Sequence, residues 1–228
     1  MSLLSLLGIS PQISGLLVEA TLETLHMTAV SGGIGTLLGL PLGVVLATSG
    51  RGELLQWVGF NRVAGLVVNA TRSTPFIILV VAIIPFTRMI AGTSIGTTAA
   101  IVPLTVAAAP FIARVVENAI REVDQGLIEA AKAMGATPLQ IVRKVLIPEA
   151  MPGIVAGLTL ALVSLIGYSA MVGAVGGGGL GDLGIRYGYQ RFMPDVMALV
   201  VLVLIILVQS VQTIGDYLAR RVNKRLMS

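Results

Sequence analysis

The residues of this chain that could carry chemistry are few. The sequence has no cysteine and one histidine, His26, so thiol chemistry and a Cys/His metal site are excluded and His26 is expected to be structural. Residues 179 to 184 read G-L-G-D-L-G, the spacing of a dinucleotide-binding loop, but no strand pattern precedes them and we interpret them as a flexible outer loop. No G-x-x-x-x-G-K-[ST] loop occurs, so neither nucleotide hydrolysis nor a metal site is predicted.

The amino-acid composition and the distribution of charged residues are those of a membrane protein. The sequence is 55% hydrophobic and 11% charged, against about 25% charged residues in an ordinary soluble domain. Four runs contain no Asp, Glu, Lys or Arg and are each long enough to cross a bilayer: 24–50, 89–113, 150–181 and 196–215. A fifth run, 73–87, is short, but Arg72 and Arg88 at its ends can extend their side chains to the headgroups.

These runs predict an all-α membrane protein with five spanning helices in a single domain, residues 1–228. We expect the spans near residues 24–48, 72–88, 94–113, 151–172 and 195–216, with a cytoplasmic loop at 114–150. Twelve of the fifteen Lys and Arg residues fall in 51–72, 114–150 and the C-terminal tail, and three fall in the other connections. This bias predicts an outside N-terminus and a cytoplasmic C-terminus. The cations lie in connections rather than in one stripe with aromatics, so no nucleic-acid partner is predicted.

One cytoplasmic stretch, 129–148, is amphipathic in an otherwise apolar chain. Residues 114–134 are expected to be helical, with Glu117 and Arg121 paired one turn apart, and Gly135 is placed to end that helix in a left-handed cap. Thr137, followed by proline and by Gln140, fits a capping box that starts a second, short helix. This helix would present Leu139, Ile141, Val142 and Val145 beside Arg143 and Lys144, and would end at Pro148. The sequence thus predicts a helix, a sharp bend and a short capped helix.

The spacing of this stretch resembles the EAA signature of the membrane permeases of bacterial ABC importers. The pattern is E-A-A-x-x-x-G, nine residues, and V-L-I-P, where Val145 and Ile147 are conservative departures from I-x-L-P. The resemblance implies that the short helix is a coupling helix that docks in a cleft of an ATPase subunit. The resemblance also implies that Ala130 and Ala131 allow close helix approach and that Glu129 supplies a charge that fixes the bend. The coupling residues would be Glu129, Ala130, Ala131, Gly135, Thr137, Pro138, Leu139, Ile141, Val142, Arg143 and Pro148. An ordinary interfacial amphipathic helix is the alternative.

The resemblance extends over nearly the whole chain. The runs R-S-T-P-F at 72–76, I-P-F-T-R-M-I-A-G-T-S-I-G at 84–96, A-P-F-I-A-R-V-V-E-N-A at 109–119 and G-Y-S-A-M at 167–171 are similar to permeases of methionine importers in particular. The resemblance implies a type I importer permease in the bacterial inner membrane, in contact with lipid. Two copies of the permease would form a homodimer, and this dimer would bind two ABC ATPase subunits. An extracytoplasmic binding protein would deliver D- and L-methionine, and ATP and Mg²⁺ would be used by the ATPase, with no cofactor on this chain. A permease for another small amino acid, a non-ABC transporter subunit and a passive structural subunit remain alternatives.

The translocation path is expected in the fourth span. Ser164, Tyr168, Ser169 and Met171 stand among aliphatic residues there, and polar groups in hydrocarbon face protein or water. Tyr168 and Met171 are three residues apart and share a helix face. The face is either ordinary helix packing or a gate suited to a thioether side chain.

Two further patterns have simple structural interpretations. Small residues recur every four positions in the first span, at Ser31, Gly35, Gly39 and Gly43, which predicts close helix packing rather than a substrate site. Glu19 and Glu23, just before that span, are expected on a solvated outer face.

Overall fold

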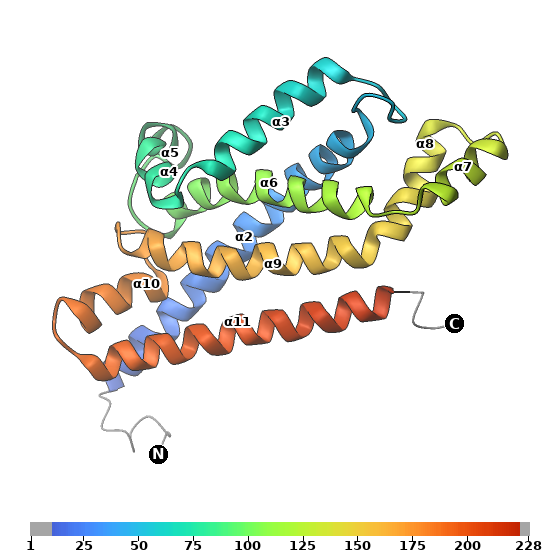
Figure 1. The fold of residues 1–228 in the computed structure, drawn as a ribbon. Coiled ribbons are helices and arrows are strands. Elements are labelled where there is room, and N and C mark those ends of the chain that lie inside the picture. The colour runs from blue at the N-terminus through green and yellow to red at the C-terminus, as the bar shows by residue number, and fades with distance from the viewer. Residues whose placement is uncertain (1–10, 224–228) are drawn as a thin grey trace. The chain divides into compact units, whose positions relative to one another are not determined.

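The computed structural model describes residues 11–223, in which every regular element is helical. Lys224 and Arg225, counted above among the cytoplasmic charges, lie outside the described residues. The elements, in chain order, are α2 (Pro11–Thr48), α3 (Val58–Ser73), α4 (Phe76–Ala82), α5 (Ile84–Ala91), α6 (Thr97–Arg121), α7 (Gln125–Ala133), α8 (Pro138–Ile141), the π-helix η1 (Val142–Leu146), α9 (Ile147–Gly173), α10 (Gly179–Leu183), the π-helix η2 (Gly184–Tyr189) and α11 (Pro194–Val222) (Figure 1). The predicted all-α class is confirmed.

Four helical stretches are long and apolar enough to cross a membrane: Gln12–Thr48, Thr97–Arg121, Pro138–Gly173 and Pro194–Val222. A fifth span exists only if α3 and α4 count together as one broken span. The structure therefore supports a multi-pass membrane protein with four or five spans.

The region predicted as one span over 72–88 is divided into the end of α3, α4 and α5. Thr74 is extended, with φ −82° and ψ 125°, as expected for a residue before a proline. Pro75 then stands at the start of α4, and Pro85 occupies the first turn of α5. Because proline cannot donate the i→i−4 hydrogen bond, each proline begins a new helix instead of continuing the old one.

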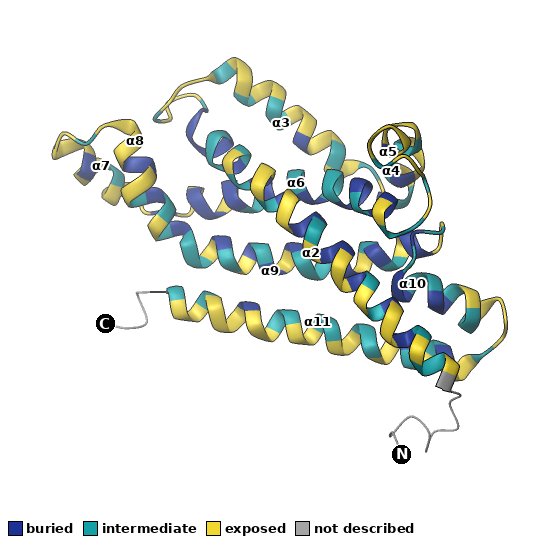
Figure 2. Cartoon of the chain, turned by 180° about the vertical axis from the view of Figure 1, so that it is seen from behind, coloured by how far each residue is buried: buried dark blue, intermediate teal, exposed yellow. Residues whose placement is uncertain are grey.

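Residue contacts divide the chain into two compact units. The first is built from the described residues up to Gly33, with 75–106 and 162–211, and the second from 34–74, 107–161 and the residues from Gln212 onward. The first unit has an apolar core formed by Leu17, Ala20, Leu180, Leu183, Val196 and Val200. The second has a core that includes Leu46, Val68 and Ala113. Exposed residues occur along much of α3 and α11 (Figure 2).

In the first unit, the G-x-G-x-x-G stretch is helical rather than a flexible loop, so that prediction was wrong. It forms α10 and the start of η2, and Leu180 is fully buried. A Cβ at Gly179 would lie 2.6 Å from Oγ1 of Thr24, and one at Gly181 would overlap the carbonyl of Ala170. The glycines are therefore required for close packing and not for holding a phosphate.

Glu23 also differs from its prediction. Its Oε2 accepts the Gly179 N–H at 2.6 Å, and Thr24 Oγ1 accepts the Leu180 N–H at 2.9 Å. These two side chains satisfy backbone donors at the start of α10 that would otherwise have no helical partner. Glu23 is thus a structural cap, whereas Glu19 is exposed as expected.

In the second unit, the small-residue ladder packs α2 against α6. A Cβ at Gly35 would lie 2.7 Å from Cβ of Ala108, one at Gly39 would lie 2.6 Å from the carbonyl oxygen of Ala109, and one at Gly43 would overlap the carbonyl of Ala113. The close packing predicted from the spacing is confirmed for these three glycines.

Candidate functional site

The bend at Gly135 is fixed by backbone hydrogen bonds. Gly135 has φ +79°, the left-handed conformation predicted for it. Its N–H donates to the Lys132 carbonyl at 2.9 Å, and the Ala136 N–H donates to the Ala131 carbonyl at 3.0 Å. These two bonds are the pair that defines a Schellman motif, so the last carbonyls of α7 are satisfied while the chain turns.

The short helix after the bend begins with the predicted capping box. The Gln140 N–H donates to Thr137 Oγ1 at 3.4 Å, and the Thr137 N–H donates to Gln140 Oε1 at 2.9 Å. Pro138 occupies the first turn, where its missing N–H costs no hydrogen bond. The entry into α8 is therefore determined by local residues alone.

The side chains of this element divide into an exposed and a buried set. Leu139 is 71% exposed, and Thr137, Pro138, Arg143 and Pro148 are exposed as well. Ile141 and Val142 are 1% and 6% exposed, so they pack inside this chain and cannot contact a partner directly. Met134, which sequence reasoning did not select, is 81% exposed at the bend. Two exposed apolar side chains, Met134 and Leu139, are therefore available for docking near this bend.

The helix before the bend is not continuous, contrary to the prediction for 114–134. α6 ends at Arg121, and α7 starts after Asp124, whose Oδ1 accepts the Gly126 N–H at 2.7 Å. Asp124 is a favourable N-cap residue, and this local signal could have revealed the break.

The residues of the E-A-A triplet have different surroundings within α7. Ala131 is buried, whereas Glu129 and Ala130 are exposed. Glu129 takes part in no ion pair between described residues. The bend is therefore held by backbone hydrogen bonds, and the role that the resemblance implies for Glu129 stays a prediction.

Pro148 does not end the short helix, so that prediction was also wrong. Pro138–Gly173 is one helical stretch, with the π-helix η1 between α8 and α9. The Ile147 N–H donates to the Val142 carbonyl, five residues back. This local π register, a wider turn than the α-helix, lets the helix continue where a proline follows.

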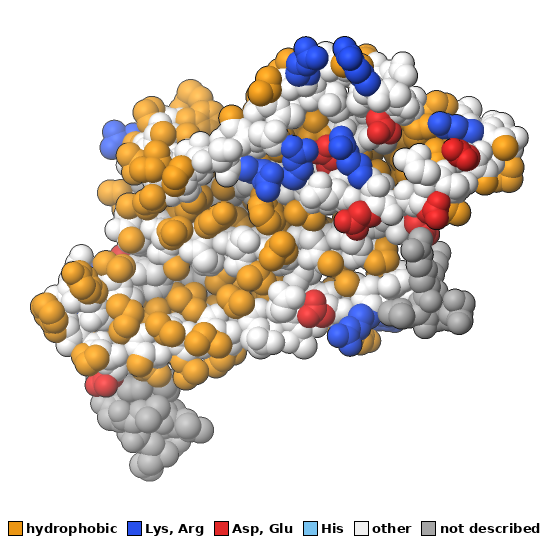
Figure 3. Space-filling model, in the orientation of Figure 1, with side chains coloured by type: hydrophobic (Ala, Val, Ile, Leu, Met, Phe, Trp, Pro, Cys, Tyr) orange, Lys and Arg blue, Asp and Glu red, His pale blue; other side chains and the backbone are white. Residues whose placement is uncertain are grey.

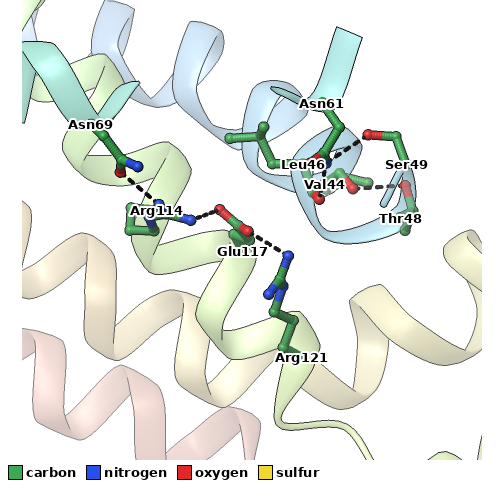
Figure 4. A network of polar contacts seen from close by, with 9 residues as sticks. All are labelled: Val44, Leu46, Thr48, Ser49, Asn61, Asn69, Arg114, Glu117 and Arg121. Atoms are coloured by element: carbon green, nitrogen blue, oxygen red, sulfur yellow. Dashed lines mark hydrogen bonds and ion pairs between the residues drawn. The ribbon is translucent and has the colours of Figure 1, made fainter. Parts of the chain in front are cut away.

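A polar network joins α3 and α6 in the second unit (Figure 4). Arg114 donates from Nη2 to Asn69 Oδ1 at 2.6 Å and from Nη1 to Glu117 Oε2 at 2.6 Å. Arg121 Nη2 lies 2.8 Å from Glu117 Oε1, which confirms the predicted pair. The Glu117 side chain is only 3% exposed. Sequence spacing revealed one of its two arginines but not its burial or the link to α3.

The fourth-span residues are distributed over more than one environment. The Tyr168 ring stacks on Phe76 with centroids 4.4 Å apart, and Met171 is 48% exposed. Ser169 is buried, and its hydroxyl donates to the Ile166 carbonyl at 2.7 Å. Ser164 is half-buried. The gate interpretation therefore depends on Tyr168 and Met171, while Ser169 is engaged within its own helix.

An all-helical membrane chain with an exposed, capped helix at a glycine bend agrees with the resemblance to the permease class of ABC importers. The chain belongs to the family of binding-protein-dependent transport system inner membrane components, whose pattern matches residues 39–228. Members of this family are the translocating components rather than the ATPases, in agreement with the prediction that the chain is not an enzyme.

Known relatives are similar over most of the chain. The Vibrio cholerae protein named "Probable D-methionine transport system permease protein MetI" is 58% identical over 212 residues, 93% of this chain and 94% of that protein. The D-methionine transport system permease protein MetI of Escherichia coli K12 is 60% identical over 158 residues, 69% of this chain and 73% of that protein. A permease chain of the inward-facing MetNI methionine ABC transporter has a TM-score of 0.92 at 55% identity, covering 94% of this chain and 100% of that chain.

Proposed function

We propose that this chain is the permease subunit of an ATP-driven importer that moves D- and L-methionine across the inner membrane. The observation that supports methionine as the substrate is the 58% identity to a protein named as a probable D-methionine permease, over 93% of the chain. The observation that supports coupling to an ATPase is the pre-formed helix α8, which presents Leu139 beside the Gly135 bend.

The proposed assembly has two copies of this chain, two ABC ATPase subunits and an extracytoplasmic methionine-binding protein. One chain offers one coupling helix, and two ATPase subunits that close around two nucleotides need two such helices. ATP and Mg²⁺ are used by the ATPase subunits, and this chain supplies no cofactor site. The apolar side chains of Met134 and Leu139 would be desolvated on docking, with Arg143 at the rim of the contact.

In the proposed topology α3 and α4 together form the second of five spans, with the N-terminus outside. The excess of Lys and Arg in 51–72, 114–150 and the C-terminal tail favours the cytoplasmic side for the start of α3, for the loop 114–150 and for the C-terminal tail. The coupling element then faces the ATPase, and the loop that contains Thr93 faces the binding protein. Tyr168 and Met171 are our candidates for the gate.

Reconstitution tests the substrate and the energy source together. The chain, co-purified with its ATPase and placed in lipid vesicles with the binding protein, should accumulate methionine only when ATP is supplied. A panel of other small amino acids should give at most a small fraction of that uptake. Uptake that is independent of ATP, or an equal preference for another amino acid, would contradict the proposal.

A further inference from the structure

We propose that a polar stripe on α3 and α6 lines the cytoplasmic half of the translocation path and binds the carboxylate of the transported amino acid. The stripe consists of Arg62, Asn69 and Arg72 on α3 and Arg114, Asn118 and Arg121 on α6. This inference rests on the proposed function for its ligand. Its evidence is the arrangement of these side chains in the second unit.

Helix α3 has three distinct faces. Asn61 and Val68, seven residues apart, form the packed face: Asn61 donates to the Leu46 carbonyl at 2.8 Å, and Val68 is 2% exposed. Phe60, Val63 and Val67 form an apolar face and are 47%, 63% and 60% exposed, while Leu66, 64% exposed, lies outside this face.

The third face of α3 carries the stripe residues Arg62, Asn69 and Arg72, all exposed. Asn69 lies two residues after Val67, which places it about 200° around the helix from that valine. The three polar side chains therefore point away from Val63 and Val67, but the exposed Leu66 lies among them, four residues after Arg62 and three before Asn69.

Helix α6 presents the matching side of the stripe. Arg114, Asn118 and Arg121 follow at i, i+4 and i+7, and their side chains reach the surface. On α6 no large apolar side chain is exposed among the described residues. The two helices meet through Arg114 and Asn69, and the Arg72 guanidinium lies 6.0 Å from the Phe111 ring centroid. Figure 3 shows a group of Lys and Arg side chains over α6.

The stripe has more positive charge than its neighbours neutralise. Glu117 forms ion pairs with both Arg114 and Arg121, so one carboxylate neutralises two guanidinium groups only in part. Arg72 takes part in no ion pair between described residues, and its contact is with an aromatic ring. A guanidinium binds a carboxylate well because its fork of N–H donors matches the two oxygens. The unmatched charge at Arg72 is therefore suited to an anionic group.

The position of the stripe favours a water-filled path over lipid. A membrane helix turns its apolar face to lipid, and on α3 that face is the one with Val63 and Val67. Charged side chains in spanning segments face protein or water. A stripe on the opposite side of α3, in which Leu66 is the exposed apolar side chain, continues onto a helix with no exposed large apolar side chain and therefore fits an aqueous surface that an amino acid can follow.

The first test measures access to water in the complete complex and does not depend on transport. Because the chain has no cysteine, single cysteines can be introduced without background. Asn118→Cys on the stripe should react with a charged, membrane-impermeant thiol reagent in open vesicles at least about tenfold faster than Val67→Cys on the apolar face, since only the hydrated thiolate reacts. Equal or reversed rates would overturn the proposal.

The second test concerns the ligand. Arg72→Gln should lower ATP-driven methionine uptake about tenfold or more while the ATPase subunits still co-purify, because a charge-assisted hydrogen bond is lost. Arg72→Lys, which keeps the charge, should retain uptake within about threefold. Arg221→Gln, an exposed arginine at the end of α11, is the charge-matched control and should leave uptake unchanged.

The outcomes separate this inference from the proposed function. Wild-type uptake by Arg72→Gln would overturn the carboxylate site. If Arg72→Gln lowers uptake only in vesicles that contain anionic phospholipid, Arg72 binds lipid headgroups, and the carboxylate site is overturned as well. If the wild-type complex shows no ATP-driven methionine uptake, the proposed function fails, while the cysteine comparison still decides whether the stripe faces water.

Discussion

Substitution of Gly135 tests whether the bend between α7 and α8 sets the direction of the coupling helix. Gly135 has φ +79°, and no heavy atom lies within 4 Å of a Cβ built on it, apart from its chain neighbours. A larger side chain therefore meets no obstacle, and the effect of a substitution comes from backbone preference. Gly135→Val and Gly135→Asn form a matched pair, because asparagine tolerates the left-handed region and valine does not.

The magnitude follows from the backbone. Left-handed conformation costs an ordinary L-residue roughly 1–2 kcal/mol, and a β-branched residue is at the upper end of that range. A penalty of this size changes the ratio of the bent to the unbent loop by about 5- to 30-fold. The Schellman hydrogen bonds at Gly135 and Ala136 would be lost in the unbent form, and α8 would point elsewhere.

ATP-driven methionine uptake in vesicles is the assay, with membrane content and ATPase co-purification measured on the same preparations. Gly135→Val should reach the membrane in normal amounts, since insertion depends on the apolar spans, and should lose uptake by up to about 30-fold. Gly135→Asn should retain most of the uptake. Wild-type uptake in the valine variant would refute the reasoning, and equal damage by asparagine would show that backbone conformation is not the cause.

Three other predictions concern docking, packing and topology. Leu139→Asp should reduce co-purification with the ATPase while the chain remains folded, whereas Ile141→Asp should reduce the folded yield itself, because it buries an unpaired charge; equal effects would contradict the division into exposed and buried side chains. Gly43→Leu should destabilise the chain by about 1–3 kcal/mol in a detergent thermal-melting assay, since the side chain would meet the Ala113 backbone; an unchanged melting temperature would contradict the close α2–α6 contact. A reporter at Gly52 should be cytoplasmic and one at Thr93 external if α3 and α4 together form one span; both on the same side would favour four spans.

Local signals explain which features of the coupling element could be predicted from sequence. The left-handed Gly135 and the Thr137–Gln140 capping box depend on residues within one turn of the chain, and both were confirmed. The packing role of Gly39 and Gly43 was likewise readable, because a four-residue repeat of small side chains brings one helix face close to a neighbour.

The features that were missed depend on distant parts of the chain. A helix of four residues has no periodicity that tells which side chain is covered, so the burial of Ile141 beside the exposed Leu139 could not be predicted. The glycines at 179 and 181 appeared flexible because nothing in their neighbourhood reveals the contacts with Thr24 and Ala170. The continuation past Pro148 was missed because a π-helical turn has no simple sequence signature.

The continuity of Pro138–Gly173 gives the coupling element a direction of action. α8, η1 and α9 share one helical backbone, so a displacement of the docking residue Leu139 is carried along α9. On the other side, residues 122–124 interrupt the helix between α6 and α7, and the Gly135 bend separates α7 from α8. A rigid connection on one side and two breaks on the other mean that an ATPase acting on α8 should move α9 more readily than α6. The ion pairs of Glu117 and the Asn69 contact hold α6 to α3. Gly153 and Gly157 of α9 pack closely against Ala119 and Val115 of α6, so we expect a displacement of α9 to reach α6 through this contact rather than through α7.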